Sequence, residues 1–100
     1  MTGLSFSRAA RAHLLAIGRY TEETWGIKQR DLYLKKLFRC FDKLRRSPLS
    51  GKPRDALFAG MRSIQCEMHV VYYYFLHDEV FIAGVLHHRM EPELHLTERE

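Results

Sequence analysis

The sequence predicts an α+β fold: a short N-terminal strand, an antiparallel two-helix hairpin, and then a three-stranded antiparallel sheet. Two observations indicate it. Hydrophobic residues recur every three or four positions up to about residue 46, which is the period of an amphipathic helix. After residue 60 the chain changes to runs of β-branched and aromatic residues, which favour strands. Because 100 residues have room for one hydrophobic core, we expect a single domain over residues 1–100.

The first quarter of the chain is expected to form a strand and a helix. Residues 4–7 alternate between apolar and polar, and Ser7 is placed to cap the helix that follows. A stripe of apolar and small residues continues to Trp25, and Gly26 is the residue type that most readily ends a helix. The pattern therefore predicts a helix from about Arg8 to Thr24.

A second helix is predicted to end near Arg46, because leucine and phenylalanine recur with helical spacing from Leu34 to Leu44. The break at residues 26–27 is too short for a long crossover, so the two helices should form an antiparallel hairpin with their apolar stripes facing one sheet. The segment 47–54, SPLSGKPR, has the composition of an exposed loop.

Three strands are expected over residues 61–66, 68–76 and 80–88, and their short connections require antiparallel neighbours. The middle run, VVYYYFL, is continuous rather than alternating. We expect the helices to cover one face of it and tyrosine rings to stay on the other face, where a partner can bind. The core is predicted to include Leu14, Ile17, Leu37, Phe38, Phe41, Ile64 and Ile82.

Positive charge is concentrated in the middle of the chain. Between Lys28 and Arg62 there are eleven Lys or Arg residues against three Asp, whereas residues 91–100 form an acidic tail with four Glu and one Arg. Such a field favours an acidic partner, although a solvated helix face that aids solubility would have the same composition.

The sequence also limits the compartment and the chemistry. It shows no secretory signal and no apolar run long enough for a membrane span, so we expect a cytoplasmic protein. Cys40 falls in a helical stripe and Cys66 in a strand, and we expect both thiols to be free. Phosphate-binding loops, paired-cysteine motifs and nucleophile elbows are missing from the sequence, so we expect no cofactor and no metal site.

A small set of residues could still act on a target. His87, His88 and Arg89 follow one another at a strand end, where imidazole could move protons and arginine could stabilise a phosphate, although adjacent histidines should point to opposite faces. Arg62 opens a predicted strand, and its alternatives are a solvated edge residue, an ion pair or a phosphate contact.

The order of several short segments resembles the ParE branch of the RelE/ParE superfamily of bacterial toxins, over nearly the entire chain. The segments are Ala9 and Ala10, IGRYTEETWG from Ile17, Tyr33 with Leu37 and Phe41, Pro48, Gly51, Asp55 and Leu57, Gly60 to Arg62, HVVYYYF from His69, and VLHHRME from Val85. The resemblance implies a helical hairpin on an antiparallel sheet. It also implies a type II toxin that is neutralised by a ParD-like antitoxin, in a hetero-oligomer that binds operator DNA through the antitoxin.

The superfamily has two kinds of target. ParE-type toxins are known as inhibitors of DNA gyrase that block replication, whereas RelE-type toxins cut messenger RNA on the ribosome. In a nuclease, Arg62, His87 and His88 would be the catalytic residues. The strand that precedes His87 lacks the arginine that such nucleases commonly place there, so we favour gyrase inhibition without catalytic residues. The residues expected to contact the target or partner are Arg62, His87, His88, Arg89, Arg39 and Lys43.

Overall fold

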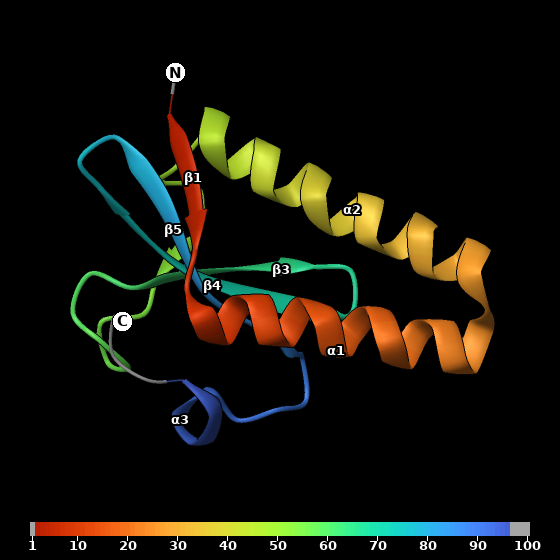
Figure 1. Cartoon of the computed structure of the whole chain (residues 1–100). Helices are drawn as coiled ribbons and strands as arrows, with labels where there is room; N and C mark the ends of the chain where they lie inside the picture. Colours follow the sequence, from red (N-terminus) through yellow and green to blue (C-terminus); the bar gives the residue numbers. More distant parts are fainter. Residues whose placement is uncertain (1, 97–100) are drawn as a thin grey trace.

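A five-stranded mixed sheet with a helical hairpin on one face is the framework of the protein (Figure 1). The computed structural model describes residues 2–96. The elements in chain order are β1 (Gly3–Phe6), α1 (Arg8–Trp25), α2 (Ile27–Arg46), β2 (Lys52–Pro53), β3 (Arg62–Cys66), β4 (His69–Leu76), β5 (Glu79–His87) and α3 (Pro92–His95). The sheet order is β1-β5-β4-β3-β2, with β1 parallel to β5 and every other pair antiparallel.

The hairpin follows the predicted local signals. The Ser7 hydroxyl accepts a hydrogen bond from the Ala10 amide (2.9 Å), which caps α1 as expected. Gly26 joins the helices with a φ of 94°, a value that side-chain-bearing residues rarely adopt. In Figure 1 α1 and α2 diverge from this junction as the two arms of a V.

A β-bulge connects α1 to the sheet. Tyr72 pairs with Gly84 and Tyr73 pairs with Ile82, which leaves Ala83 as an extra residue in β5. The Ser7 hydroxyl donates to the Ala83 carbonyl (2.9 Å), and His13 Nδ1 accepts from the Val85 amide (3.1 Å). Side chains of α1 thus satisfy the backbone groups of β5 that lie beyond the end of β1.

Both faces of the sheet are covered, which corrects the expectation that tyrosine rings of the middle strand are exposed. Tyr73 packs into the core beneath the hairpin, whereas Tyr72 and Tyr74 pack into a second core on the opposite face with Met61 and Leu96. All three rings are buried, with at most 3% exposed. The last described residue, Leu96, is itself buried, while residues 97–100 of the acidic tail lie outside the described residues.

The predicted core is largely confirmed. Ile17, Leu37, Phe41 and Ile82 are buried, and Leu14 and Ile64 pack against the same cluster while partly buried. Phe38 is wrong as a core residue, because 46% of it is exposed. Its ring lies beside those of Phe6 and Phe41, with centroids 6.3 Å and 5.2 Å away, at the margin of the core rather than within it.

The segment 47–54, which was predicted as an exposed loop, is bound to the sheet. Residues 52–53 form β2 against β3, and the Tyr73 hydroxyl accepts from the Gly51 amide (2.9 Å) and donates to the Pro48 carbonyl (2.8 Å). A Cβ on Gly51 would lie 2.5 Å from that hydroxyl, so glycine is required for the close approach.

The expectation of two free thiols is wrong. Cys40 of α2 and Cys66 of β3 form a disulfide with a Cα–Cα distance of 6.3 Å. The bond requires α2 to cross directly over β3, an arrangement that the hydrophobic period of either element does not specify.

Candidate functional site

An aromatic pocket of about 480 Å³ lies where the end of the hairpin near Gly26 meets the start of β4 and the end of β5. We call it the aromatic pocket, and its lining residues are Tyr20, Thr21, Trp25, Gln29, Tyr33, Met68, His69 and His87. Tyr20 and Trp25 are more than 60% exposed, although large aromatic side chains are usually covered. The segment IGRYTEETWG, one of those on which the resemblance rests, therefore supplies one wall of the pocket.

The floor of the aromatic pocket is a hydrogen-bonded pair. The Tyr33 hydroxyl accepts from the Met68 amide (3.1 Å) and lies 2.6 Å from His69 Nδ1, to which it is placed to donate. Burial, followed by the neighbouring His87 and His88, lowers the pKa of His69 to about 4. Burial raises the pKa of Tyr33. At neutral pH both side chains are therefore uncharged, and His69 Nδ1 accepts a hydrogen bond from the Tyr33 hydroxyl.

Three histidine rings form a row at this end of the sheet. The ring centroids of His69 and His87 are 5.6 Å apart, and those of His87 and His88 are 4.4 Å apart. Desolvation, then His88 and Arg89, lowers the pKa of His87. As expected for opposite faces, His87 lines the aromatic pocket and His88 lines a pocket on the other side. Their rings nevertheless remain close, because His88 lies beyond the end of β5.

A second, basic pocket of about 510 Å³ lies on the face of the sheet away from the hairpin, and His88 forms part of it. Lys52 and Arg54 line it together with Ser63 and Tyr72. The Arg54 guanidinium donates to the Ser63 hydroxyl (3.2 Å) and lies 5.5 Å from the centre of the Tyr72 ring. Lys52 and Arg54 were not among the contact residues predicted from the sequence. Their alternate spacing around Pro53 was the available signal, since it places both on one face of a strand.

Arg62 is not part of either pocket. It pairs with Tyr73 across β3 and β4, so it lies on the hairpin face, and its guanidinium donates to the carbonyls of Gly51 (2.7 Å) and Leu49 (3.2 Å). The guanidinium is partly exposed and is held by backbone carbonyls rather than by a carboxylate. Cys66, at the other end of β3, lies about 13 Å from Arg62 along the strand. Cys66 pairs with His69, which in turn pairs with His87. Arg62 and His87 therefore lie at opposite ends of the strands and do not converge.

The remaining predicted contacts occupy two places. Arg89 is exposed and follows the histidine row, and its amide donates to His87 Nδ1 (3.2 Å). Arg39 and Lys43 are exposed one turn apart on α2.

The described part of the chain, residues 2–96, holds no group of three His, Cys, Asp or Glu side chains placed to bind a metal ion. None of its helices is long and apolar enough to cross a membrane.

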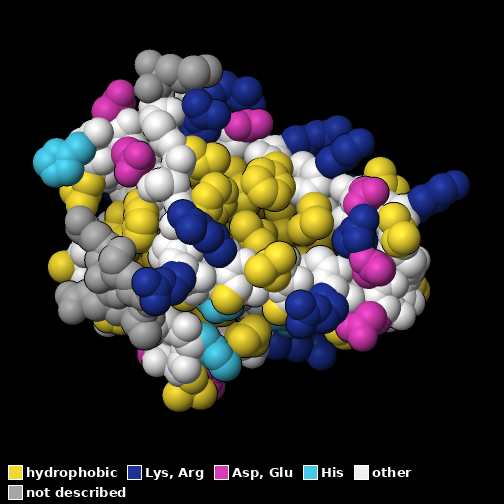
Figure 2. All heavy atoms as spheres, in the orientation of Figure 1, with side chains coloured by type: hydrophobic (Ala, Val, Ile, Leu, Met, Phe, Trp, Pro, Cys, Tyr) yellow, Lys and Arg dark blue, Asp and Glu magenta, His cyan; other side chains and the backbone are white. Residues whose placement is uncertain are grey.

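An apolar groove separates the two arms of the hairpin. Figure 2 shows hydrophobic side chains gathered between α1 and α2, with both basic and acidic side chains along the margins. The apolar residues Leu14, Leu15 and Leu34 line it, together with the charged residues Arg19, Glu22, Glu23, Arg30 and Asp31. Such an exposed apolar surface fits the apolar side of an amphipathic segment.

Comparison with known proteins decides the family. Residues 4–92 match the family model described as the ParE toxin of the type II toxin–antitoxin system parDE. The chain belongs to the ParE toxin family. Toxin ParE1 of Caulobacter vibrioides is 36% identical over 90 residues, covering 90% of this chain and 93% of that protein. Toxin ParE1 of Mycobacterium tuberculosis strain H37Rv is 31% identical over 91 residues, with the same coverage. Toxin ParE of Escherichia coli is 31% identical over 100 residues, covering 99% of this chain and 97% of that protein.

A solved structure carries the same fold. The match, described as a chromosomal ParDE toxin–antitoxin system from P. aeruginosa, has a TM-score of 0.75 at 19% identity, over 87% of this chain and 96% of that chain. The ParE-type fold that the sequence predicted is therefore confirmed, with five strands in place of the expected four. The chain is a ParE-type toxin of a type II toxin–antitoxin system.

Proposed function

We propose that this ParE-family toxin inhibits DNA gyrase and so blocks replication in the cytoplasm, without catalytic chemistry of its own. The observation that carries the proposal is the placement of Arg62. Its guanidinium is held by two loop carbonyls on the hairpin face, whereas His88 faces the opposite side. A nuclease needs basic and proton-transferring groups around one phosphate, and these residues do not surround one.

Induction in growing bacteria tests the target class. A gyrase inhibitor should provoke a DNA-damage response and long undivided cells while translation continues. Arg62→Ala should weaken the toxin only through the 49–51 loop that it holds or through a contact with the target, because no proton transfer depends on it. Lys28→Ala, which removes an exposed basic residue of α2, is the matched control. Collapse of protein synthesis within minutes, with intact DNA, would exclude gyrase as the target.

The proposed partner is a ParD-like antitoxin whose acidic, partly disordered segment folds into the groove between α1 and α2. The apolar floor of the groove (Figure 2) and the excess of Lys and Arg over Asp in the sequence of α2 support this assignment. A segment that gains order on binding can cover a large surface, and opposite charge speeds its association. We further propose that the complex is a hetero-oligomer that binds operator DNA through the antitoxin.

A second candidate function is ribosome-dependent cleavage of messenger RNA, and the basic pocket is the observation that favours it. Lys52, Arg54 and His88 line one cavity, so two cations and one imidazole could approach a phosphate there. Under this alternative Lys52→Ala, Arg54→Ala and His88→Ala should each lower RNA cleavage on ribosomes by about 10² or more. Intact RNA after incubation with the wild-type toxin and translating ribosomes would eliminate the candidate.

A further inference from the structure

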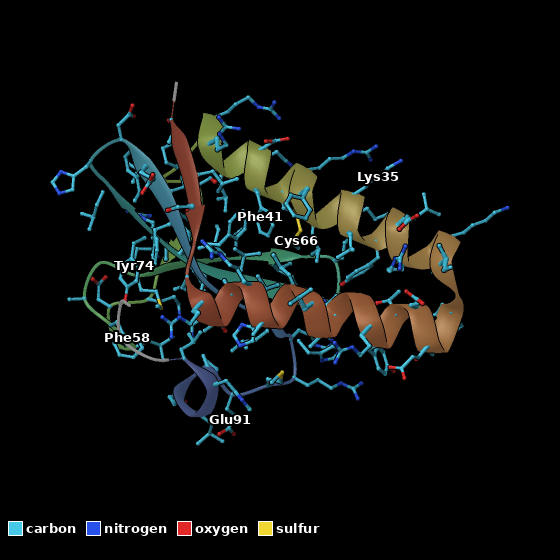
Figure 3. All side chains as sticks on the ribbon, viewed as in Figure 1. Lys35, Phe41, Phe58, Cys66, Tyr74 and Glu91 are labelled. Atoms are coloured by element: carbon cyan, nitrogen blue, oxygen red, sulfur yellow. A yellow bond between two sulfur atoms is a disulfide. The ribbon has the colours of Figure 1, made fainter. Side chains whose placement is uncertain are left out.

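We propose that Cys40 is the entry point of a thiol–disulfide exchange site that accepts small anionic thiols. The proposal concerns the Cys40–Cys66 disulfide, which links the middle of α2 to the end of β3 (Figure 3). It is independent of the target on which the toxin acts. Three features carry it: unequal access to the two sulfurs, positive charge around the accessible one, and an acceptor beside the buried one.

Access to the two sulfurs differs. Cys66 is buried, with 2% exposed, and lies in the core beneath the hairpin. Cys40 is partly exposed and lines a pocket of about 350 Å³ that opens between the C-terminal half of α2 and β3. Exchange proceeds by attack of a thiolate on one sulfur of the disulfide, and the attacked sulfur must be within reach. The attack is therefore directed to Cys40.

The pocket at Cys40 is positively charged. Lys43 and Arg46 line it together with Ser47, Ser50, Ile64 and Gln65, so none of its lining residues, all within the described chain, is acidic. By contrast, Lys36 on the preceding turn is paired with Glu67, with a Nζ–Oε1 distance of 3.6 Å. Two cations with serine and glutamine donors form a site for carboxylates. A thiol that carries carboxylates, such as a glutathione-like peptide, would be concentrated there.

The buried sulfur has a place to receive its proton. The Cys66 sulfur lies 3.8 Å from the Lys36 carbonyl oxygen, an acceptor that a thiol can use and a disulfide cannot. When an incoming thiolate bonds to Cys40 Sγ, the Cys40–Cys66 bond breaks and its electron pair passes to Cys66 Sγ. That sulfur takes up a proton and, as a thiol, donates to Lys36.

The second step completes the exchange. Another molecule of the same thiol, as its thiolate, attacks the outer sulfur of the mixed disulfide and releases Cys40 as a thiolate, which takes up a proton. Two small thiols are thereby oxidised to their disulfide, and the protein disulfide is reduced to two thiols. Because the bond joins α2 to β3, its state determines whether α2 is covalently held to the sheet.

Reduction rates test the proposal on the oxidised full-length chain. Three thiols of different charge serve as probes: reduced glutathione (anionic), 2-mercaptoethanol (neutral) and cysteamine (cationic). Each rate is divided by the rate of the same thiol with a small uncharged disulfide, which removes intrinsic reactivity. At low salt the normalised rate should be about tenfold higher for glutathione than for cysteamine. The preference should shrink at about 0.5 M salt, where charges are screened within a few ångströms.

Charge and site variants complete the test. Lys43→Gln with Arg46→Gln should remove most of the glutathione preference. The control, Lys28→Gln with Lys35→Gln, removes the same charge from elsewhere on α2, and Lys35 points away from the sheet (Figure 3). In wild type, acid quenching early in the reaction should trap the glutathione adduct on Cys40. Adducts on Cys66, equal normalised rates for the three thiols, or equal effects of the two double variants would each overturn the proposal.

Discussion

Single side chains decide how stability responds to pH, and His69 is the clearest case. Its pKa of about 4 lies below the ordinary value of 6.5, so between these values the unfolded chain binds a proton that the folded chain does not. Stability is therefore full above about pH 6.5 and declines as the pH falls toward 4. His69→Gln should flatten the decline measured by urea denaturation from pH 7 to pH 5. His77→Gln, at an exposed turn residue, should keep the wild-type slope.

The Tyr73 hydroxyl gives a second prediction for one residue. In Tyr73→Phe the Gly51 amide loses its acceptor and the Pro48 carbonyl loses its donor, in a region where the ring is fully buried. The free energy of unfolding should fall by about 1–3 kcal/mol. Tyr20→Phe, at a ring that is 66% exposed, should change it by less than about 0.5 kcal/mol. Equal losses in the two variants would contradict the assigned role of Tyr73.

Local chemistry explains which residues were predictable. Ser7 was predicted as a cap because its partner, the Ala10 amide, is three residues away. The partners of Arg62 lie 11 and 13 residues away, on a loop whose path depends on Tyr73. The histidine row could be predicted only in part, since His87 and His88 are adjacent in the sequence but His69 joins them through strand pairing.

Among the elements, the helices and the three long strands followed from the sequence, because each has its own hydrophobic period. The two-residue strand β2 and the parallel pairing of β1 with β5 did not follow. Both depend on which neighbours the rest of the sheet provides. The continuous run in β4 correctly indicated a buried strand, but not that the chain returns through α3 to bury Leu96 on the second face.

The disulfide gives a prediction for α2 and β3. Replacing both cysteines with serine should lower the free energy of unfolding by about 3 kcal/mol, because the bond closes a loop between positions separated by 26 residues. Wild type in excess dithiothreitol should lose a similar amount, whereas the serine variant should not respond to the reductant. Denaturant melts of the four samples provide the measurement. A reductant-insensitive wild type would mean that the bond does not stabilise the fold.

For the whole molecule, the charge pattern predicts how the antitoxin associates. Arg39→Glu with Lys43→Glu reverses two exposed charges on α2 and should slow association with the antitoxin by about tenfold at low salt. The dissociation rate should change less, since exposed charges mainly act on encounter. Surface plasmon resonance at two salt concentrations separates the rates. An unchanged association rate would place the antitoxin away from the side of α2 that carries Arg39 and Lys43.

That residues 1–100 form one folding unit stays a prediction.

The most direct test of the central claim is DNA supercoiling by purified gyrase with this toxin added. We expect the toxin to block supercoiling and the cognate antitoxin to restore it. Lys52→Ala with Arg54→Ala should leave inhibition intact, because no phosphate chemistry in the basic pocket is needed. Full supercoiling at toxin concentrations that stop bacterial growth would exclude gyrase as the target. RNA cleavage on ribosomes by the wild type but not by the Lys52→Ala, Arg54→Ala variant would instead assign a nuclease activity to the basic pocket.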